Sequence, residues 1–260
     1  MNLPRLIIPG FMKCGSSSLH ECLGTHPDVV LPKELKDKGR ESHFFSNEHN
    51  YGKGLEHYAA SFVDNGPGRT AVDKTPEYIM SAHSLHRIKT DLPFSMLIIL
   101  LRDPVARCVS HWRHYLLGTL WPGVEIVDFD EALRRALNDK PYFDSFLTRG
   151  LYARYLAPAI SMWSLNRIFL TSLEDLVSPL GNQILLDLQI WSGLSPVSLE
   201  FGTHNDSIEN LSRNEDAERH ALAATPPSEW ALDTLKNYYE QPNRDLRRLL
   251  GTALTPGWAL

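Results

Sequence analysis

Small and basic residues fill a short loop near the start of the sequence, where they could bind an anion. The segment Gly10-Phe11-Met12-Lys13-Cys14-Gly15-Ser16-Ser17-Ser18 lies between an apolar stretch and a stretch typical of a helix. Small side chains let backbone N–H groups converge on a phosphate, and the positive end of the helix dipole adds to the attraction. We therefore expect an anion site formed by Lys13, Cys14, Gly15, Ser16, Ser17 and Ser18.

This loop departs from the Walker A motif of nucleotide triphosphatases. Gly10 and Gly15 have the Walker spacing, but two serines follow where the motif requires lysine and then serine or threonine. The lysine lies inside the loop instead, at position 13. The alternative interpretation is a serine-rich helix cap beside a solvated lysine. The apolar and helical stretches on either side favour the anion loop.

A second candidate anion element follows the most apolar run of the sequence. Arg102 comes directly after that run, and Ser110 stands two helical turns further on. An arginine at the carboxyl end of a central strand faces the region where α/β proteins bind ligands. Arg102 and Ser110 could thus bind a phosphate together. The alternative, which the sequence leaves open, is that Arg102 and Asp103 form a local ion pair or helix cap.

A carboxylate and an imidazole occur two residues apart in the segment Glu41-Ser42-His43-Phe44-Phe45. In an extended segment both side chains point to one side, and the two phenylalanines can anchor the segment in the core. Such a pair suits proton abstraction from a hydroxyl or amine, and apolar surroundings would raise the pKa of the carboxylate toward neutrality. A further lysine, Lys74, stands in Asp73-Lys74-Thr75-Pro76-Glu77-Tyr78 after another strand-like run.

Strand-like and helix-like stretches alternate along the chain. The strands are expected at Leu6 to Pro9, Thr70 to Val72, Ser95 to Leu101 and Arg167 to Thr171. The helices are expected at Ser16 to Leu23, Pro104 to Leu117, Leu151 to Trp163 and Ser228 to Leu250, the last broken in two at Pro242. This alternation predicts a single α/β domain over residues 1 to 260, with a parallel sheet flanked by helices on both faces.

Composition limits the class of protein. Of the 260 residues, 43% are hydrophobic and 22% charged, so an ample core can form. The net charge of -5 argues against general nucleic-acid binding, although residues 1 to 114 carry 14 basic and 12 acidic side chains. Three cysteines without a C-x-x-C pair suit reduced thiols, and the longest apolar run has six residues. We expect a cytoplasmic protein with no membrane span and no metal-ligand cluster.

Taken in order, these elements resemble the sulfotransferases that use 3′-phosphoadenosine 5′-phosphosulfate, particularly the heparan-sulfate sulfotransferase type and its bacterial relatives. The resemblance lies in the loop Lys13 to Leu19 (5′-phosphosulfate), Arg102-Asp103-Pro104 to Ser110 (3′-phosphate), the E-x-H-F-F segment at Glu41 and the K-T-P segment at Lys74. Further similarity in Arg149-Gly150-Leu151-Tyr152, in Tyr239 to Asn243 and in Gly257-Trp258 extends it over nearly the whole chain.

The resemblance implies a P-loop-kinase-like fold and in-line transfer of a sulfuryl group to a hydroxyl or amine, without a metal. It makes Glu41 the general base, with His43 orienting the acceptor or sharing that role. It places Lys13 at the leaving phosphate and Lys74 on the acceptor or sulfuryl side. The region from Phe201 to Arg219 lacks the basic Gly-Arg loop with which the family binds adenosine, and Arg213 is its possible substitute.

The sequence leaves the acceptor open among a small molecule, a lipid and a saccharide. Ser46 stands where the heparan enzymes often carry an acid, and residues 115 to 260 hold 12 basic against 19 acidic side chains, which favours a small or weakly charged acceptor. Two alternative functions stay open: a P-loop kinase acting on a small molecule, and a non-catalytic nucleotide-binding protein. The oligomeric state is open as well.

Overall fold

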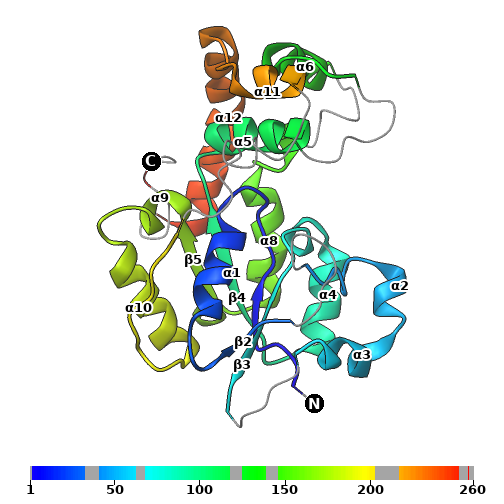
Figure 1. Cartoon of the computed structure of the whole chain (residues 1–260), viewed down its shortest axis with the longest axis vertical. Coiled ribbons are helices and arrows are strands. Elements are labelled where there is room, and N and C mark those ends of the chain that lie inside the picture. Colours follow the sequence, from blue (N-terminus) through cyan, green and yellow to red (C-terminus); the bar gives the residue numbers. More distant parts are fainter. Residues whose placement is uncertain are drawn as a thin grey trace. The chain divides into compact units, whose positions relative to one another are not determined.

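The computed structural model describes residues 2–32, 41–62, 68–117, 125–138, 146–202, 217–251 and 257 (Figure 1). The chain divides into two compact units. The first comprises Met1–Leu101 and Arg154–Thr203, and the second comprises Arg102–Ala153 and His204–Leu260. No helix among the described residues is long and apolar enough to cross a lipid bilayer. Cys14, Cys22 and Cys108 are all buried and form no disulfide.

A parallel sheet forms the centre of the first unit. In the described residues its five strands are β1 (Leu6–Ile8), β2 (Val29–Val30), β3 (Thr70–Lys74), β4 (Met96–Leu101) and β5 (Ile168–Ser172), in the order β2-β3-β1-β4-β5. Every residue of β1 and β4 is buried. Such burial explains their unbroken apolar runs, because a strand covered on both faces needs no polar alternation.

Helices cover this sheet. Those of the first unit are α1 (Ser16–Gly24), α2 (Glu48–Tyr51), α3 (Gly54–Ala60), α4 (Ala82–Asp91), α9 (Leu173–Leu176) and α10 (Gly181–Ser192), with two 3₁₀ turns, η1 (Tyr78–Met80) and η2 (Leu165–Arg167). The helix α8 (Tyr152–Met162) begins in the second unit and continues in the first. α1 packs on β2 and β3 and lies in front of the strands in Figure 1. The predicted fold class, a parallel α/β sheet flanked by helices, is confirmed.

The second unit is helical in the described residues. It contains α5 (Pro104–Leu117), α6 (Phe129–Leu137), α11 (Ala217–Ala224) and α12 (Glu229–Leu250), and α5 packs against both α11 and α12. Trp112, Leu116, Leu235 and Tyr239 are among the buried residues of its core. The Tyr239 hydroxyl donates to the carbonyl of Leu147 at 2.8 Å, which satisfies the one polar atom that this ring brings into the core.

The structure confirms the four predicted strands and three of the four predicted helices to within about one or two residues. β2 was not foreseen, because two valines are too short a pattern to detect. The predicted break at Pro242 is wrong, since α12 runs unbroken through it. Its buried residues, Ala231, Leu235, Tyr239 and Leu246, lie on both sides of the proline. Packing on both sides outweighs the lost backbone hydrogen bond.

Gly10 brings the end of β1 close to the turn after β3. The Ile79 N–H donates to the Pro9 carbonyl at 2.8 Å. A Cβ atom on Gly10 would overlap Cγ2 of Ile79 and lie 3.0 Å from the Pro76 carbonyl oxygen. The start of the loop and the K-T-P segment can therefore approach each other only with glycine at position 10.

We predict that Gly10→Ala lowers the free energy of unfolding by about 3 kcal/mol, because the added methyl group overpacks this contact. Ile79→Ala should cost a similar amount alone, through the cavity it leaves. In the double variant the overlap with Cγ2 of Ile79 is gone and only the 3.0 Å contacts remain, so the cost of Gly10→Ala should fall to less than about half of its cost in the parent. Urea unfolding of the four proteins measures these values, and strictly additive costs would contradict the proposed contact.

Candidate active site

The predicted anion loop forms a tight turn that leads into α1. Lys13 and Gly15 both have left-handed backbone conformations, with φ of 66° and 88°. At position 15 a Cβ atom would also lie 2.8 Å from Cδ1 of Leu173, so glycine is required there. α1 begins at Ser16, and its first turn contains no acidic side chain. The backbone N–H groups and the positive dipole end of α1 thus favour an anion at this loop.

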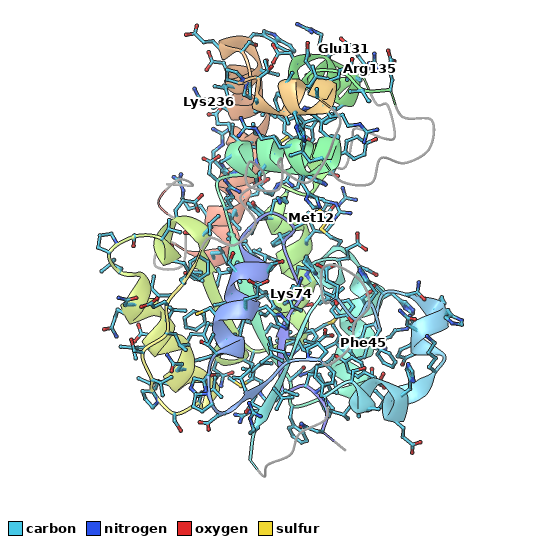
Figure 2. All side chains as sticks on the ribbon, viewed as in Figure 1. Met12, Phe45, Lys74, Glu131, Arg135 and Lys236 are labelled. Atoms are coloured by element: carbon cyan, nitrogen blue, oxygen red, sulfur yellow. The ribbon has the colours of Figure 1, made fainter. Side chains whose placement is uncertain are left out.

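Lys74 connects the loop to the acidic segment. It is the last residue of β3 and pairs in register with Ile8 of β1, so that both strands end at the same edge of the sheet. Its side chain is only 1% exposed, and its Nζ donates to Ser17 Oγ at 3.2 Å and to Glu41 Oε1 at 2.9 Å. Figure 2 shows Lys74 beside α1. One buried ammonium therefore touches both the helix start and the carboxylate.

Glu41 and His43 contact each other, as the sequence predicts. His43 Nε2 lies 3.3 Å from Glu41 Oε2, and the backbone N–H of His43 donates to Thr75 Oγ1 at 3.4 Å. The expected extended conformation is wrong at His43, whose φ is 46°. A turn over residues 44–46, in which the Asn47 N–H donates to the His43 carbonyl at 3.0 Å, sets this backbone instead. The structure thus brings Glu41, His43, Lys74 and Ser17 together.

The pKa of Glu41 differs from the sequence expectation. Burial raises the pKa of this carboxyl, but the hydrogen bond with His43 and the charge and hydrogen bond of Lys74 outweigh it. The resulting pKa lies below the ordinary value, so the predicted rise toward neutrality is wrong. Glu41 is consequently ionised at neutral pH and can accept a proton.

The pKa of His43 is shifted in the opposite direction. The hydrogen bond with Glu41 raises it, burial lowers it, and the negative charges of Glu41, Glu77 and Asp73 raise it further, so that it lies above its ordinary value. Glu77 Oε2 lies 3.9 Å from His43 Nδ1, on the other ring nitrogen from Glu41. The imidazole therefore stands between two carboxylates.

A cluster of hydroxyl groups around the buried carboxylate of Asp73 fixes the segment that contains Glu41 and His43. Asp73 is fully buried, and its Oδ2 accepts from the hydroxyls of Ser42 at 2.9 Å, Tyr58 at 2.7 Å and Tyr78 at 3.1 Å. Burial raises the pKa of this carboxyl, and the hydroxyl donors lower it in part. This cluster cannot be recognised from the sequence, because only the fold brings Tyr58 of α3 and Ser42 to the same carboxylate.

Aromatic packing completes this anchor. The ring of Phe44 stacks on Tyr58 with centroids 4.3 Å apart, and Phe45 meets Tyr78 edge to face at 5.6 Å. Figure 2 shows Phe45 between the strands and α2. The expectation that the two phenylalanines anchor the segment in the core is confirmed, since both are buried. The position of Glu41 and His43 is thus held by the core.

The second candidate anion element lies in the second unit. Arg102 follows β4 directly and is half-buried, as is Ser110 on α5. The Arg102 carbonyl accepts from the Tyr152 hydroxyl at 2.7 Å. Asp103 Oδ1 accepts from the Ala106 N–H at 2.8 Å, so Asp103 caps α5, which was one of the two local roles that the sequence left open for it.

Arg213 lies outside the described residues. Among the described residues no group of three His, Cys, Asp or Glu could hold a metal.

We predict that Ser42→Ala lowers the free energy of unfolding by about 1 to 2 kcal/mol, because it removes the hydroxyl of a half-buried serine that contacts buried Asp73 and Tyr78. Ser46→Ala is the matched control in the same turn, where the serine is exposed, and should change stability by less than about 0.5 kcal/mol. Urea unfolding measures both. Equal effects of the two substitutions would contradict the anchoring role.

A second prediction concerns pH. The raised pKa of folded His43 means that its stabilising contact is fully present below its ordinary value of 6.5 and is lost as pH rises through the folded value. The lowered pKa of Glu41 means that its contribution is present above its ordinary 4.5 and is lost as pH falls. The stability difference between the parent and His43→Gln should therefore shrink from about pH 5.5 to about pH 8.5. Urea unfolding across this range tests the pair, and a constant difference would contradict it.

Comparisons with known proteins agree with these features. A family model for the sulfotransferase domain matches residues 3–222. Heparan sulfate glucosamine 3-O-sulfotransferase 3B1 of Mus musculus is 29% identical over 271 residues, which cover 98% of this chain and 65% of that protein. Heparan sulfate glucosamine 3-O-sulfotransferase 6 of Homo sapiens is 31% identical over 182 residues, covering 70% of this chain and 50% of that protein. The chain thus spans less than two thirds of these relatives.

Solved structures show the same fold. A sulfotransferase from Alicyclobacillus acidocaldarius superposes with a TM-score of 0.73 at 18% identity and covers 96% of both chains. The sulfotransferase domain from the curacin biosynthetic pathway has a TM-score of 0.51 at 15% identity, covering 91% of this chain and 98% of that one. The family model matches most of the chain, and both structures have its fold. The chain belongs to the sulfotransferase family.

Proposed function

We propose that the protein transfers a sulfuryl group from 3′-phosphoadenosine 5′-phosphosulfate to a hydroxyl or amine of a small-molecule, lipid or saccharide acceptor. The observation that carries this proposal is the contact of Lys74 with both Ser17, at the anion loop, and the ionised Glu41. It brings a candidate base next to a candidate sulfate site. The names of the two relatives, both heparan sulfate glucosamine 3-O-sulfotransferases, favour a saccharide among the three acceptor classes.

The proposed reaction is an in-line displacement at sulfur. The acceptor oxygen or nitrogen forms a bond to sulfur while the bond from sulfur to the 5′-phosphate oxygen breaks. The 5′-phosphate leaves with the electron pair, and Glu41 takes the acceptor proton. Such a transfer depends mainly on positioning and on stabilisation of the charge that develops on the leaving oxygen.

The roles of the side chains follow from this scheme. Lys13 and the N–H groups at the start of α1, from Gly15 to Ser18, bind the 5′-phosphosulfate, together with Cys14 in the same turn. Lys74 stabilises the transferred sulfuryl group and holds Glu41. His43 orients the acceptor, and its contact with Glu41 at 3.3 Å keeps that carboxylate ionised. A metal has no role in this scheme.

The remaining donor contacts are proposed from the motifs alone. Arg102 and Ser110 bind the 3′-phosphate, and Arg213 contacts the adenosine. We also propose that the whole of residues 1 to 260 forms one sulfotransferase domain, which the match over residues 3–222 supports. A cytoplasmic location is proposed from the three free thiols.

Binding of the product nucleotide tests the donor site. We predict that 3′-phosphoadenosine 5′-phosphate stabilises the protein by roughly 2.7 kcal/mol at a hundredfold excess over its dissociation constant, in EDTA. Lys13→Ala should weaken this binding about tenfold or more, because a charge-assisted contact is lost. Thermal and urea unfolding with and without the nucleotide give the measurement. Absence of stabilisation at millimolar nucleotide, or turnover of ATP that requires magnesium, would reject the proposal in favour of other functions such as a kinase.

Substitution of the base tests the chemical step. We predict that Glu41→Gln lowers kcat by about 10² to 10⁴ while nucleotide affinity changes by less than about threefold, because the amide cannot accept the proton. Glu56→Gln on α3, where the glutamate is exposed, is the matched control and should behave like the parent. Transfer of labelled sulfate from the donor into extract metabolites is the readout. A Glu41→Gln protein with the parent rate would remove Glu41 from this role.

A further inference from the structure

Glu77 is a carboxylate that the proposed transfer does not use, although it faces the proposed acceptor site. Its Oε2 lies 3.9 Å from His43 Nδ1, while Glu41 Oε2 lies 3.3 Å from Nε2 of the same ring. The turn that carries Glu77 is well fixed, because the Tyr78 N–H donates to the Thr75 carbonyl at 3.1 Å and the Ile79 N–H to the Pro9 carbonyl at 2.8 Å. The backbone at Glu77 is therefore fixed by the ends of β1 and β3.

Among the described residues, the carboxylates of Glu41 and Glu77 near His43 are far more exposed than the ammonium group of Lys74. The side chain of Glu77 is 43% exposed, that of Glu41 25%, and that of Lys74 only 1%. Lys74 also directs its charge at Glu41 and Ser17. Asp73 on β3 also acts on the imidazole through its charge but is fully buried. A molecule that approaches His43 from solvent thus meets carboxylates before it meets this lysine.

We infer that Glu77 selects the acceptor by charge, favouring a cationic or neutral group beside the reacting hydroxyl or amine and disfavouring a sulfate or carboxylate there. This inference rests on the proposed function. A unit charge on the acceptor, a few ångströms from the carboxylate of Glu77, should change the binding of that acceptor by about tenfold or more. A heparan-like polyanion would therefore be a poor acceptor at this site, even though the relatives are named for heparan sulfate.

Glu77 has a second consequence for His43. The negative charges near its two ring nitrogens favour the protonated form of the imidazole, and at 3.9 Å Glu77 acts through its charge and not through a hydrogen bond. Glu77 is accordingly a positioning and specificity residue, while Glu41 and His43 face the acceptor. Gln at position 77 keeps the size and shape of the side chain but removes its charge and replaces one acceptor oxygen with a donor amide. This substitution separates the effect of charge from that of shape.

Three matched acceptors test the charge selection. They are methyl glycosides of glucosamine that differ only at nitrogen, which carries a free amine, an acetyl group or a sulfate. We predict that the parent prefers them in this order by kcat/KM, that Glu77→Gln reduces the preference for amine over sulfate about tenfold, and that Glu77→Lys reverses it. Glu56→Gln, an exposed charge on α3, should leave the preference unchanged. An unchanged preference in Glu77→Gln would overturn the inference.

A readout without turnover covers the case in which none of these glycosides reacts. A cationic and an anionic nitroxide of the same size are added in turn, and the broadening of the His43 ring signals is measured by NMR. The cationic probe should broaden them more than the anionic one in the parent, and Glu77→Gln should reduce this ratio severalfold while Glu56→Gln does not. The same broadening ratio in Glu77→Gln as in the parent would overturn the inference.

The two failures can be told apart. If the nucleotide fails to stabilise the protein while the probe ratio still depends on Glu77, the proposed function is wrong and the charge at His43 stands. If the nucleotide binds and sulfate is transferred but neither the acceptor preference nor the probe ratio depends on Glu77, the inference about charge selection is wrong and the proposed function stands.

Discussion

The ammonium group of Lys74 is the interaction on which the arrangement of the site depends. A lysine that is 1% exposed is costly to bury unless its charge is paired, and here Glu41 Oε1 at 2.9 Å and Ser17 Oγ at 3.2 Å supply the partners. The need to pair this charge ties the acidic segment to the start of α1. Together with the hydrogen bond of His43, the charge of Lys74 lowers the pKa of Glu41, so the pairing that buries Lys74 also keeps Glu41 ionised.

Asp73 and Lys74, which are neighbours at the end of β3, both position the segment from Glu41 to His43. Successive side chains of a strand point to opposite faces, and these two neighbours contact different partners. Asp73 accepts from Ser42 among buried hydroxyls, and Lys74 contacts Glu41, the residue just before Ser42. Because both contacts originate from the end of β3, the segment from Glu41 to His43 is fixed without any regular secondary structure of its own.

Local patterns in the sequence were sufficient to predict most of the sheet and the contact of Glu41 with His43. Each depends on residues close in sequence or on the rule that parallel strands end at one edge. The sequence could not reveal the lowered pKa of Glu41, because burial raises this pKa and only the tertiary structure shows that the hydrogen bond of His43 and the charge of Lys74 outweigh it. The hydroxyl cluster at Asp73 and the continuity of α12 through Pro242 likewise depend on tertiary packing. Nothing in the local sequence around Lys74 shows that Glu77 lies near His43.

The role of Lys74 is tested most directly by following labelled sulfate from the donor into acceptors of a cell extract, in EDTA, with the parent and with Lys74→Met. Methionine retains much of the length of the lysine chain and removes its charge. The account predicts label transfer by the parent without magnesium and a loss of about 10² or more in rate for Lys74→Met, with the fold retained by circular dichroism. Transfer at the parent rate by the folded variant, or no transfer by the parent to any acceptor, would contradict it.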